Sequence, residues 1–318
     1  MQKFREVLEC QQISIYFGIV SFAAIIASFF PETVILEIVI NPVLAFMLFV
    51  TFLQIPLADL GRIFSQVRFF MALFVANFVL IPLFVAGLVQ FLPADPLVLL
   101  GVLLVLLAPC IDYVVTFSHL GRADAHLLLA ATPGLLIVQM LLLPIYLGLL
   151  LGENAIGFGD LGPFVHAFIW LIVVPLVFAG LIQFWAAQTQ KGKKVLLLLG
   201  MLPVPATALV LFVVVAAVIP QLGTATDAVL KVIPVYIAFA IFAPFIGWLV
   251  GRLFHLEAPA GRAVAFSAGT RNSLVILPLA LAVPGAIPVL PAIIVTQTLI
   301  ELVSELIYVR FIPKLTGT

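Results

Sequence analysis

Long apolar stretches, separated by short polar segments, make up most of this sequence. An apolar stretch of about 20 residues is long enough for a helix to cross the roughly 30 Å of hydrocarbon in a bilayer. The pattern predicts ten such helices, and therefore an all-α polytopic membrane protein. The expected helices cover residues 12–30, 34–55, 68–92, 97–117, 126–150, 162–186, 195–219, 229–251, 263–283 and 287–310.

The composition also indicates that lipid is the solvent. Hydrophobic residues make up 65% of the 318 residues and charged residues only 9%, whereas a soluble protein carries about 25% charged residues. The net charge is zero and no basic run occurs, which argues against a nucleic-acid partner. We interpret 12–30 as a retained first helix and not as a cleaved signal, because its lead is amphipathic and no A-x-A site follows.

Basic residues are distributed unequally between the two sets of loops that ten helices create. Twelve of the fourteen Lys and Arg residues fall on the side of the N-terminus, and Lys231 and Arg271 are the two exceptions. Loops rich in Lys and Arg remain in the cytoplasm. We therefore expect a multi-pass protein of the cytoplasmic (plasma) membrane with both termini in the cytoplasm. The twelve residues are Lys3, Arg5, Arg62, Arg68, Arg122, Lys191, Lys193, Lys194, Arg252, Arg262, Arg310 and Lys314.

Ten helices divide into two sets of five around residues 151–160. An odd number of helices per half means that the second half runs inverted relative to the first, which is a common plan of secondary transporters. We expect residues 1–318 to form one transporter domain with approximate repeats 12–150 and 162–310. The symmetry is inferred from the helix count, because the sequence contains no convincing repeat of individual residues.

Two of the expected helices, the fourth and the ninth, contain features that break a helix. Pro109 in the fourth removes a backbone donor and clashes with the preceding turn. In the ninth, Gly269 precedes the polar stretch 270–273, which has an arginine at its second position. Non-helical backbone inside a membrane is tolerated where it lines a protein-enclosed cavity. Each is the fourth helix of its half, so we expect two broken helices that cross near the membrane midplane.

Charged residues inside expected spans are candidates for function, because each costs about 2.5–3.5 kcal/mol on insertion scales. Taken singly, each feature also has a structural interpretation: a proline kink, a small core cysteine, or a polar packing face on the tenth helix. Their occurrence together favours a site. The candidate substrate-binding residues are Cys110, Asp112, Thr270, Arg271, Asn272 and Ser273, and the candidate proton-coupling residues are Glu301 and Glu305.

Other classes of site find little support. The four histidines lack the spacing of metal ligands, so we expect neither a metal site nor a cofactor. Cys10 and Cys110 are expected at different depths, which argues against a disulfide. The sequence contains no HExxH, GxSxG or nucleotide-binding loop, so an enzyme is disfavoured.

With these motifs in place, the chain resembles the bile acid/arsenite transporter superfamily, and within it the arsenite-efflux branch. The resemblance covers nearly the whole chain and rests on "LAPC" in the fourth helix, "FSAGTRNS" in the ninth and "LIELV" in the tenth. That branch pairs a cysteine of the fourth helix with a glutamate of the tenth. By the matching motifs, these residues are Cys110 and Glu301.

Two departures from the superfamily pattern concern charge. The sodium-coupled branch has a Glu and a Gln as sodium ligands at the positions that correspond to Ser267 and Arg271, and a fixed positive charge there would repel sodium. The arsenite branch has small uncharged residues where this chain has Asp112 and Arg271.

The resemblance and the residues lead to one main hypothesis and one alternative. The main hypothesis is export of arsenite, with antimonite as a related substrate, in exchange for protons. Cys110 would bind arsenic, Glu301 would carry the proton, and Arg271 would pair with Asp112 or Glu301 when the site is empty. The alternative is transport of a small organic anion that pairs with Arg271, in which Cys110 has no role.

Overall fold

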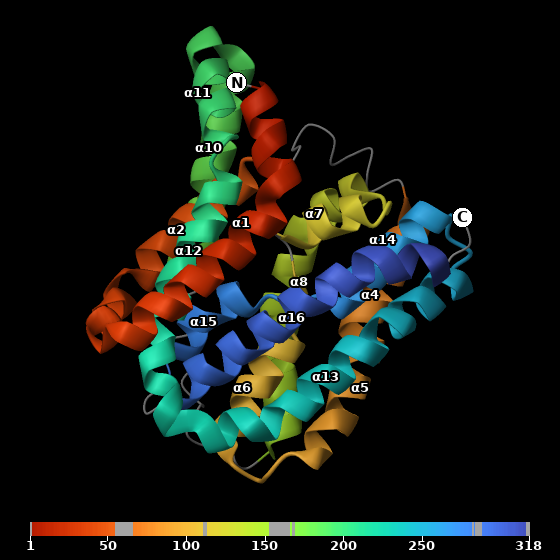
Figure 1. Ribbon diagram of the computed structural model, residues 1–318. Helices are drawn as coiled ribbons and strands as arrows, with labels where there is room; N and C mark the ends of the chain where they lie inside the picture. The colour runs from red at the N-terminus through yellow and green to blue at the C-terminus, as the bar shows by residue number, and fades with distance from the viewer. Residues whose placement is uncertain are drawn as a thin grey trace. The chain divides into compact units, whose positions relative to one another are not determined.

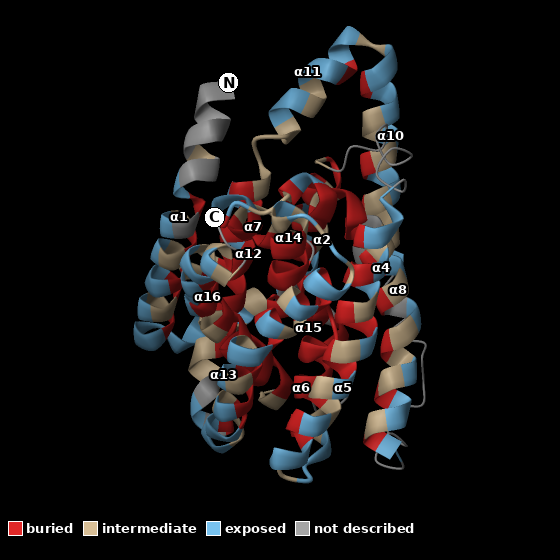
Figure 2. Cartoon of the chain, turned by 90° about the vertical axis from the view of Figure 1, so that its right-hand side faces the viewer, coloured by how far each residue is buried: buried red, intermediate tan, exposed pale blue. Residues whose placement is uncertain are grey.

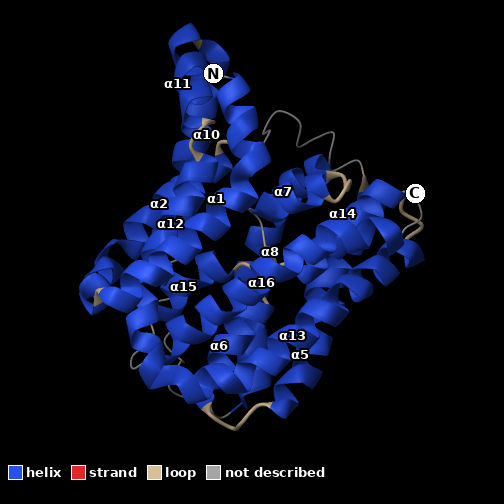
Figure 3. Cartoon of the chain, viewed as in Figure 1, coloured by secondary structure: helices blue, strands red, loops and turns tan. Residues whose placement is uncertain are grey.

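The computed structural model describes residues 2–54, 66–110, 113–152, 166, 169–281, 283 and 288–315. Within these ranges the chain forms fourteen α-helices and several short 3₁₀ or π segments, and no strand (Figure 3). The prediction of an all-α fold is confirmed. By their contacts, the residues divide into two compact units.

The first unit combines the N-terminal helices with a segment from the middle of the chain. Within it, α12 packs against both α1 and α2. The hydroxyl of Thr33 donates to the carbonyl of Ala216 (2.8 Å), and the amide of Gln183 donates to the carbonyl of Phe52 (3.1 Å). Its elements are α1 (Gln2–Phe29), η1 (Pro31–Leu36), α2 (Glu37–Phe52), η6 (Ile169–Val173), α10 (Val174–Gln188), α11 (Gln190–Leu199), α12 (Pro203–Val218) and η7 (Ile219–Gln221).

The second unit contains the broken helices. In it, α16 packs against α6, α7, α14 and α15 (Figure 1). Figure 2 shows buried positions along α6 and α14, whereas α10 of the first unit has many exposed positions. The elements of the second unit are α4 (Val67–Val75), η3 (Ala76–Leu80), α5 (Ile81–Leu88), η4 (Val89–Phe91), α6 (Pro96–Leu106), α7 (Tyr113–Leu120), α8 (Ala125–Leu151), most of α13 (Leu222–Leu253), α14 (Ala258–Gly269), α15 (Ser273–Leu281) and α16 (Val289–Leu315).

Six helices of the described chain are long and apolar enough to cross a membrane. They correspond to the expected helices two, three, five, seven, eight and ten. Shorter apolar helices stand at the first, fourth and sixth positions, and α14 and α15 divide the ninth. The apolar side chains of Ile137, Leu141, Ile145 and Leu149 recur every fourth residue of α8 and are exposed, as expected of a face in contact with lipid.

The predicted start of the seventh helix is wrong. The seventh helix was expected from residue 195, but α11 ends at Leu199 and α12 begins at Pro203. Proline restricts the residue before it and is favoured in the first turn of a helix. The chain therefore turns at residues 200–202, and the apolar run 195–219 is shared between two helices.

Both predicted interruptions are present. α6 ends at Leu106, three residues before Pro109, and α14 ends at Gly269, directly before the polar stretch. Gly269 is the last residue of α14, as expected of a position where the helix opens, and it also has a packing role. A Cβ there would lie 2.8 Å from Pro244 Cγ and 3.0 Å from Tyr308 Cε2. Gly269 therefore permits α13 and α16 to pack closely against α14.

Candidate functional site

The two interruptions meet and pair through their backbones. The amide of Cys110 donates to the carbonyl of Thr270 (3.1 Å), and the amide of Asn272 donates to the carbonyl of Ala108 (2.8 Å). Pro109 and Arg271 face each other as an antiparallel bridge. A buried backbone group outside a helix needs such a partner. The paired loops, residues 107–110 and 270–272, are called the crossing below.

Cys110 brings its thiol into the crossing. The residue is 1% exposed and forms no disulfide within the described chain. The side chain of Cys10, and the whole of Asp112, lie outside the described residues, so the expected place of Asp112 beside the crossing stays a prediction.

Glu301 of α16 connects the crossing to two helices. Its side chain is buried, and Oε2 accepts hydrogen bonds from the backbone N–H of Arg271 (2.7 Å) and from the amide of Gln297 (2.5 Å). The hydroxyl of Tyr113, at the start of α7, lies 2.5 Å from Oε1 and 3.3 Å from the carbonyl oxygen of Arg271. The carboxyl group of Glu301 is thus hydrogen-bonded to α7, to the loop after α14 and to another residue of α16.

Glu305, one turn further along α16, has a similar arrangement. It is fully buried, and Oε1 is hydrogen-bonded to the hydroxyl of Thr270. The same hydroxyl lies 2.7 Å from the carbonyl oxygen of Phe266. Oε2 of Glu305 has no hydrogen-bond partner within the described chain. Both candidate proton-coupling residues therefore lie in contact with the loop that follows α14.

Arg271 is fully buried, and its guanidinium group points to backbone carbonyls. Nη2 donates to the carbonyl oxygens of Ser267 (2.6 Å) and Ala268 (2.8 Å) and to Oδ1 of Asn77 (2.8 Å), and Nη1 donates to the carbonyl of Leu106 (3.3 Å). No carboxylate of the described residues lies within 4.0 Å of the guanidinium. Of the two expected ion pairs, the one with Glu301 is absent, and Glu301 binds the backbone N–H of Arg271 instead. The one with Asp112 stays a prediction, because Asp112 lies outside the described residues.

Two further candidates complete the polar stretch. The hydroxyl of Ser273 accepts a hydrogen bond from Thr298 of α16 (2.8 Å). Asn272 is 1% exposed, and its Nδ2 has no partner within the described chain. Oε1 of Gln297 is also buried without a described partner. Arg271 Nε and Glu305 Oε2 are in the same state. Buried polar groups without a partner are rare in folded proteins, so these four atoms mark positions available to a polar ligand.

Sequence reasoning missed four residues of this cluster. Asn77 lies within the apolar run 68–92, and Tyr113, Gln297 and Thr298 flank candidates that were recognised. Gln297 precedes Glu301 by four residues, which places both on one face of a helix. A search for polar residues one helical turn from each buried charge would have found Gln297, but nothing in the sequence aligns Asn77 with Arg271.

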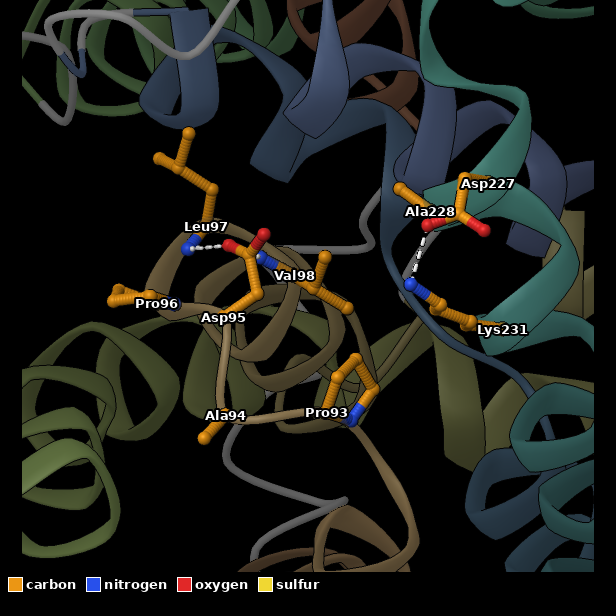
Figure 4. Close-up of a pocket in the computed structure, with 9 residues that line it drawn as sticks. All are labelled: Pro93, Ala94, Asp95, Pro96, Leu97, Val98, Asp227, Ala228 and Lys231. Carbon is orange, nitrogen blue, oxygen red and sulfur yellow. Dashed lines mark hydrogen bonds and ion pairs between the residues drawn. The ribbon is translucent and has the colours of Figure 1, made fainter.

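A separate pocket of about 610 Å³ lies at the N-terminus of α6 (Figure 4). Asp95 caps this helix by accepting hydrogen bonds from the amides of Leu97 (2.9 Å) and Val98 (3.3 Å), and Lys231 forms an ion pair with Asp227. That pair balances the charge of Lys231, one of the two exceptions to the loop-charge pattern. The pocket is about 15 Å from the crossing, since α6 rises 1.5 Å per residue between them.

Comparison with known families gives one match. The model of the sodium bile acid symporter family matches residues 41–223, which is more than half of the chain. Among curated proteins no match was found. The matched segment includes Cys110 and ends before α14, so it contains neither Arg271 nor Glu301.

Proposed function

Because the chain belongs to the sodium bile acid symporter family, which is a family of transporters and not of enzymes, we propose that it exports arsenite from the cytoplasm in exchange for protons. Antimonite is expected to follow the same route. The observation that carries the proposal is a buried thiol, that of Cys110, in a loop whose partner loop is held by the carboxyl group of Glu301.

The thiol supplies the affinity for arsenic. Sulfur is a soft ligand and suits a soft, thiophilic centre such as trivalent arsenic. Condensation of the Cys110 S–H with one As–OH of arsenous acid forms one As–S bond and releases one water, with no oxidation or reduction. Hydrolysis reverses the step. A single As–S bond is weak enough to be broken in each cycle, as a carrier requires.

The hydroxyl groups beside the two carboxyls support proton exchange. A hydroxyl has one proton to donate. When Glu301 is ionised, the hydroxyl of Tyr113 donates to it; when Glu301 is protonated, it donates to Tyr113, whose own proton turns to the carbonyl of Arg271. In the same way, the hydroxyl of Thr270 can donate its proton either to Glu305 or to the carbonyl of Phe266. Either protonation state thus keeps its hydrogen bonds.

The remaining candidates would bind the hydroxyl groups of the substrate. The donor Asn272 Nδ2 and the acceptor Gln297 Oε1, both without a described partner, match the donor and acceptor character of an As–OH group. Thr270, Ser273 and Asp112 complete the proposed polar lining. We propose that Arg271 acts on this site through its charge, since its Nη atoms already bind protein oxygens.

We also propose the finer membrane arrangement. The ten helices form two inverted repeats of five, with both termini cytoplasmic and the crossing near the membrane midplane. Support comes from the distribution of basic residues and from the two interrupted helices, α6–α7 and α14–α15, which pair with each other. Broken helices at such a position are a common feature of inverted-repeat transporters.

The test is arsenite accumulation by everted membrane vesicles driven by a proton gradient. Wild type should accumulate arsenite, whereas Cys110→Ser should lose the arsenic ligand and Glu301→Gln the exchangeable proton. The matched controls are Cys10→Ser, the other cysteine, and Glu257→Gln, an exposed glutamate, and both should transport as wild type does. Absence of arsenite movement in vesicles that contain correctly folded protein would refute the proposal.

A second candidate is transport of a small organic anion, which the description of the family favours. Arg271 would then pair with a carboxylate or sulfonate. The Nε–H of the fully buried guanidinium has no partner within the described chain, so one hydrogen bond to the anion is available there. A bidentate pair would in addition require an Nη atom to leave its carbonyl partners. The vesicle assay separates the two functions, because organic-anion transport would be indifferent to Cys110→Ser and sensitive to Arg271→Ala.

A further inference from the structure

Arg271 places a permanent positive charge at the ends of two helices. Its guanidinium binds the carbonyls of Ser267 and Ala268, in the last turn of α14, and that of Leu106, the last residue of α6. The carbonyls in the last turn of a helix have no intrahelical partner and carry the negative end of the helix dipole. The guanidinium group therefore lies at the C-terminal ends of both α14 and α6, where the negative ends of the two helix dipoles meet.

The same oxygens resemble the ligand set of a small hard cation. Such ions bind carbonyl, amide and carboxylate oxygens, and in transporters unwound backbone and the C-terminal ends of half-helices coordinate sodium. Here the set consists of three backbone carbonyls and Oδ1 of Asn77. These oxygen dipoles stabilise the charge, together with the ring of Phe239, whose centroid lies 5.4 Å from Cζ of Arg271.

Sodium does not fit beside this arginine. The distances from Nη2 to three of the oxygens are 2.6–2.8 Å, so an ion bound to the same oxygens would touch the guanidinium, and like charges at such a separation repel. We propose that the Arg271 guanidinium takes the place of a coupling sodium ion, so that the cation position of this transporter is filled by the protein itself and transport does not depend on sodium.

This inference deepens the proposed function, because it concerns which ion can act on the same site. Removal of the guanidinium should leave the cage of oxygens without its cation. Arg271→Ala should then be less stable than wild type, and a cation that enters the cage should restore stability. Two ions are suitable probes: sodium, and the guanidinium ion at millimolar concentration, which reproduces the missing group.

The experiment measures the thermal stability of the purified full-length protein in detergent. Tm is recorded in sodium, potassium and choline chloride at equal ionic strength. Wild type should give the same Tm in all three. Arg271→Ala should show a saturable rise in Tm with sodium or guanidinium, of about 5 °C at 100 times Kd. Arg262→Ala, which removes another largely buried arginine of α14, is the matched control and should respond to neither ion.

Two results would overturn the inference: a saturable, sodium-specific rise in the Tm of wild type, or an Arg271→Ala variant that responds to no cation. If Arg271→Ala does not fold, Arg271→Gln replaces it, and the wild-type measurement is decisive without any variant. Because stability is measured without substrate, failure here differs from failure of arsenite transport in vesicles.

Discussion

Replacement of Glu301 by glutamine should separate the stability of the protein from its coupling to protons. Three donors surround the carboxyl group: the backbone N–H of Arg271, the amide of Gln297 and the hydroxyl of Tyr113. A glutamine that places its oxygen at the position of Oε2 accepts from the first two. Its amide then donates to the oxygen of Tyr113, whose proton turns to the carbonyl of Arg271, 3.3 Å away.

Glu301→Gln thus reproduces the protonated carboxyl group and keeps every hydrogen bond, so its free energy of unfolding should stay within about 1 kcal/mol of wild type. Glu301→Ala leaves the N–H of Arg271 and the amide of Gln297 without an acceptor. Each buried unsatisfied group costs about 1–3 kcal/mol, so the alanine variant should lose roughly 2–6 kcal/mol. That is a large part of the 5–15 kcal/mol typical of folded proteins.

The assay combines Tm in detergent with arsenite accumulation in vesicles. Glu301→Gln should melt close to wild type and lose proton-driven accumulation, because an amide does not exchange a proton. Glu301→Ala should melt clearly lower. Equal destabilisation of the two variants would refute the hydrogen-bond network, and wild-type accumulation by Glu301→Gln would refute the role of this residue as proton carrier.

Two further predictions concern packing and capping, and both are checked by Tm. Gly269→Ala should destabilise by about 1–3 kcal/mol through overpacking, because its Cβ would lie 2.8 Å from Pro244 Cγ. In the control Gly148→Ala, the added Cβ has no neighbour within 4 Å, so the stability of the protein should not fall. Equal decreases of Tm in the two variants would contradict the close approach at Gly269. Asp95→Ala should cost about 1 kcal/mol by loss of the cap, while Asp95→Asn should retain stability and both should transport arsenite normally. A full loss of transport in either variant would instead connect the pocket with the substrate route.

The sequence was sufficient to predict the two breaks and several of the polar residues that lie beside them. Proline and a polar stretch inside apolar runs are local signals, and a buried charge such as Glu301 stands out in an apolar sequence. The partners were not predictable in the same way. Whether the guanidinium of Arg271 faces a carboxylate or a set of carbonyls depends on how α6, η3 and α14 approach each other, and no spacing in the sequence encodes that approach. The packing role of Gly269 depends on the same approach of helices and is not readable from the sequence.

The bonds that join the two loops of the crossing are made by main-chain groups of Ala108, Cys110, Thr270 and Asn272. Any amino acid except proline supplies the same N–H, and every amino acid supplies the same carbonyl. Side chains of similar volume can therefore be exchanged at these positions while the main-chain bonds that join the loops are preserved. A library randomised at residues 110, 270 and 272 and selected on toxic solutes would sample new selectivities on one architecture, which makes the crossing a practical starting point for redesigning what this transporter carries.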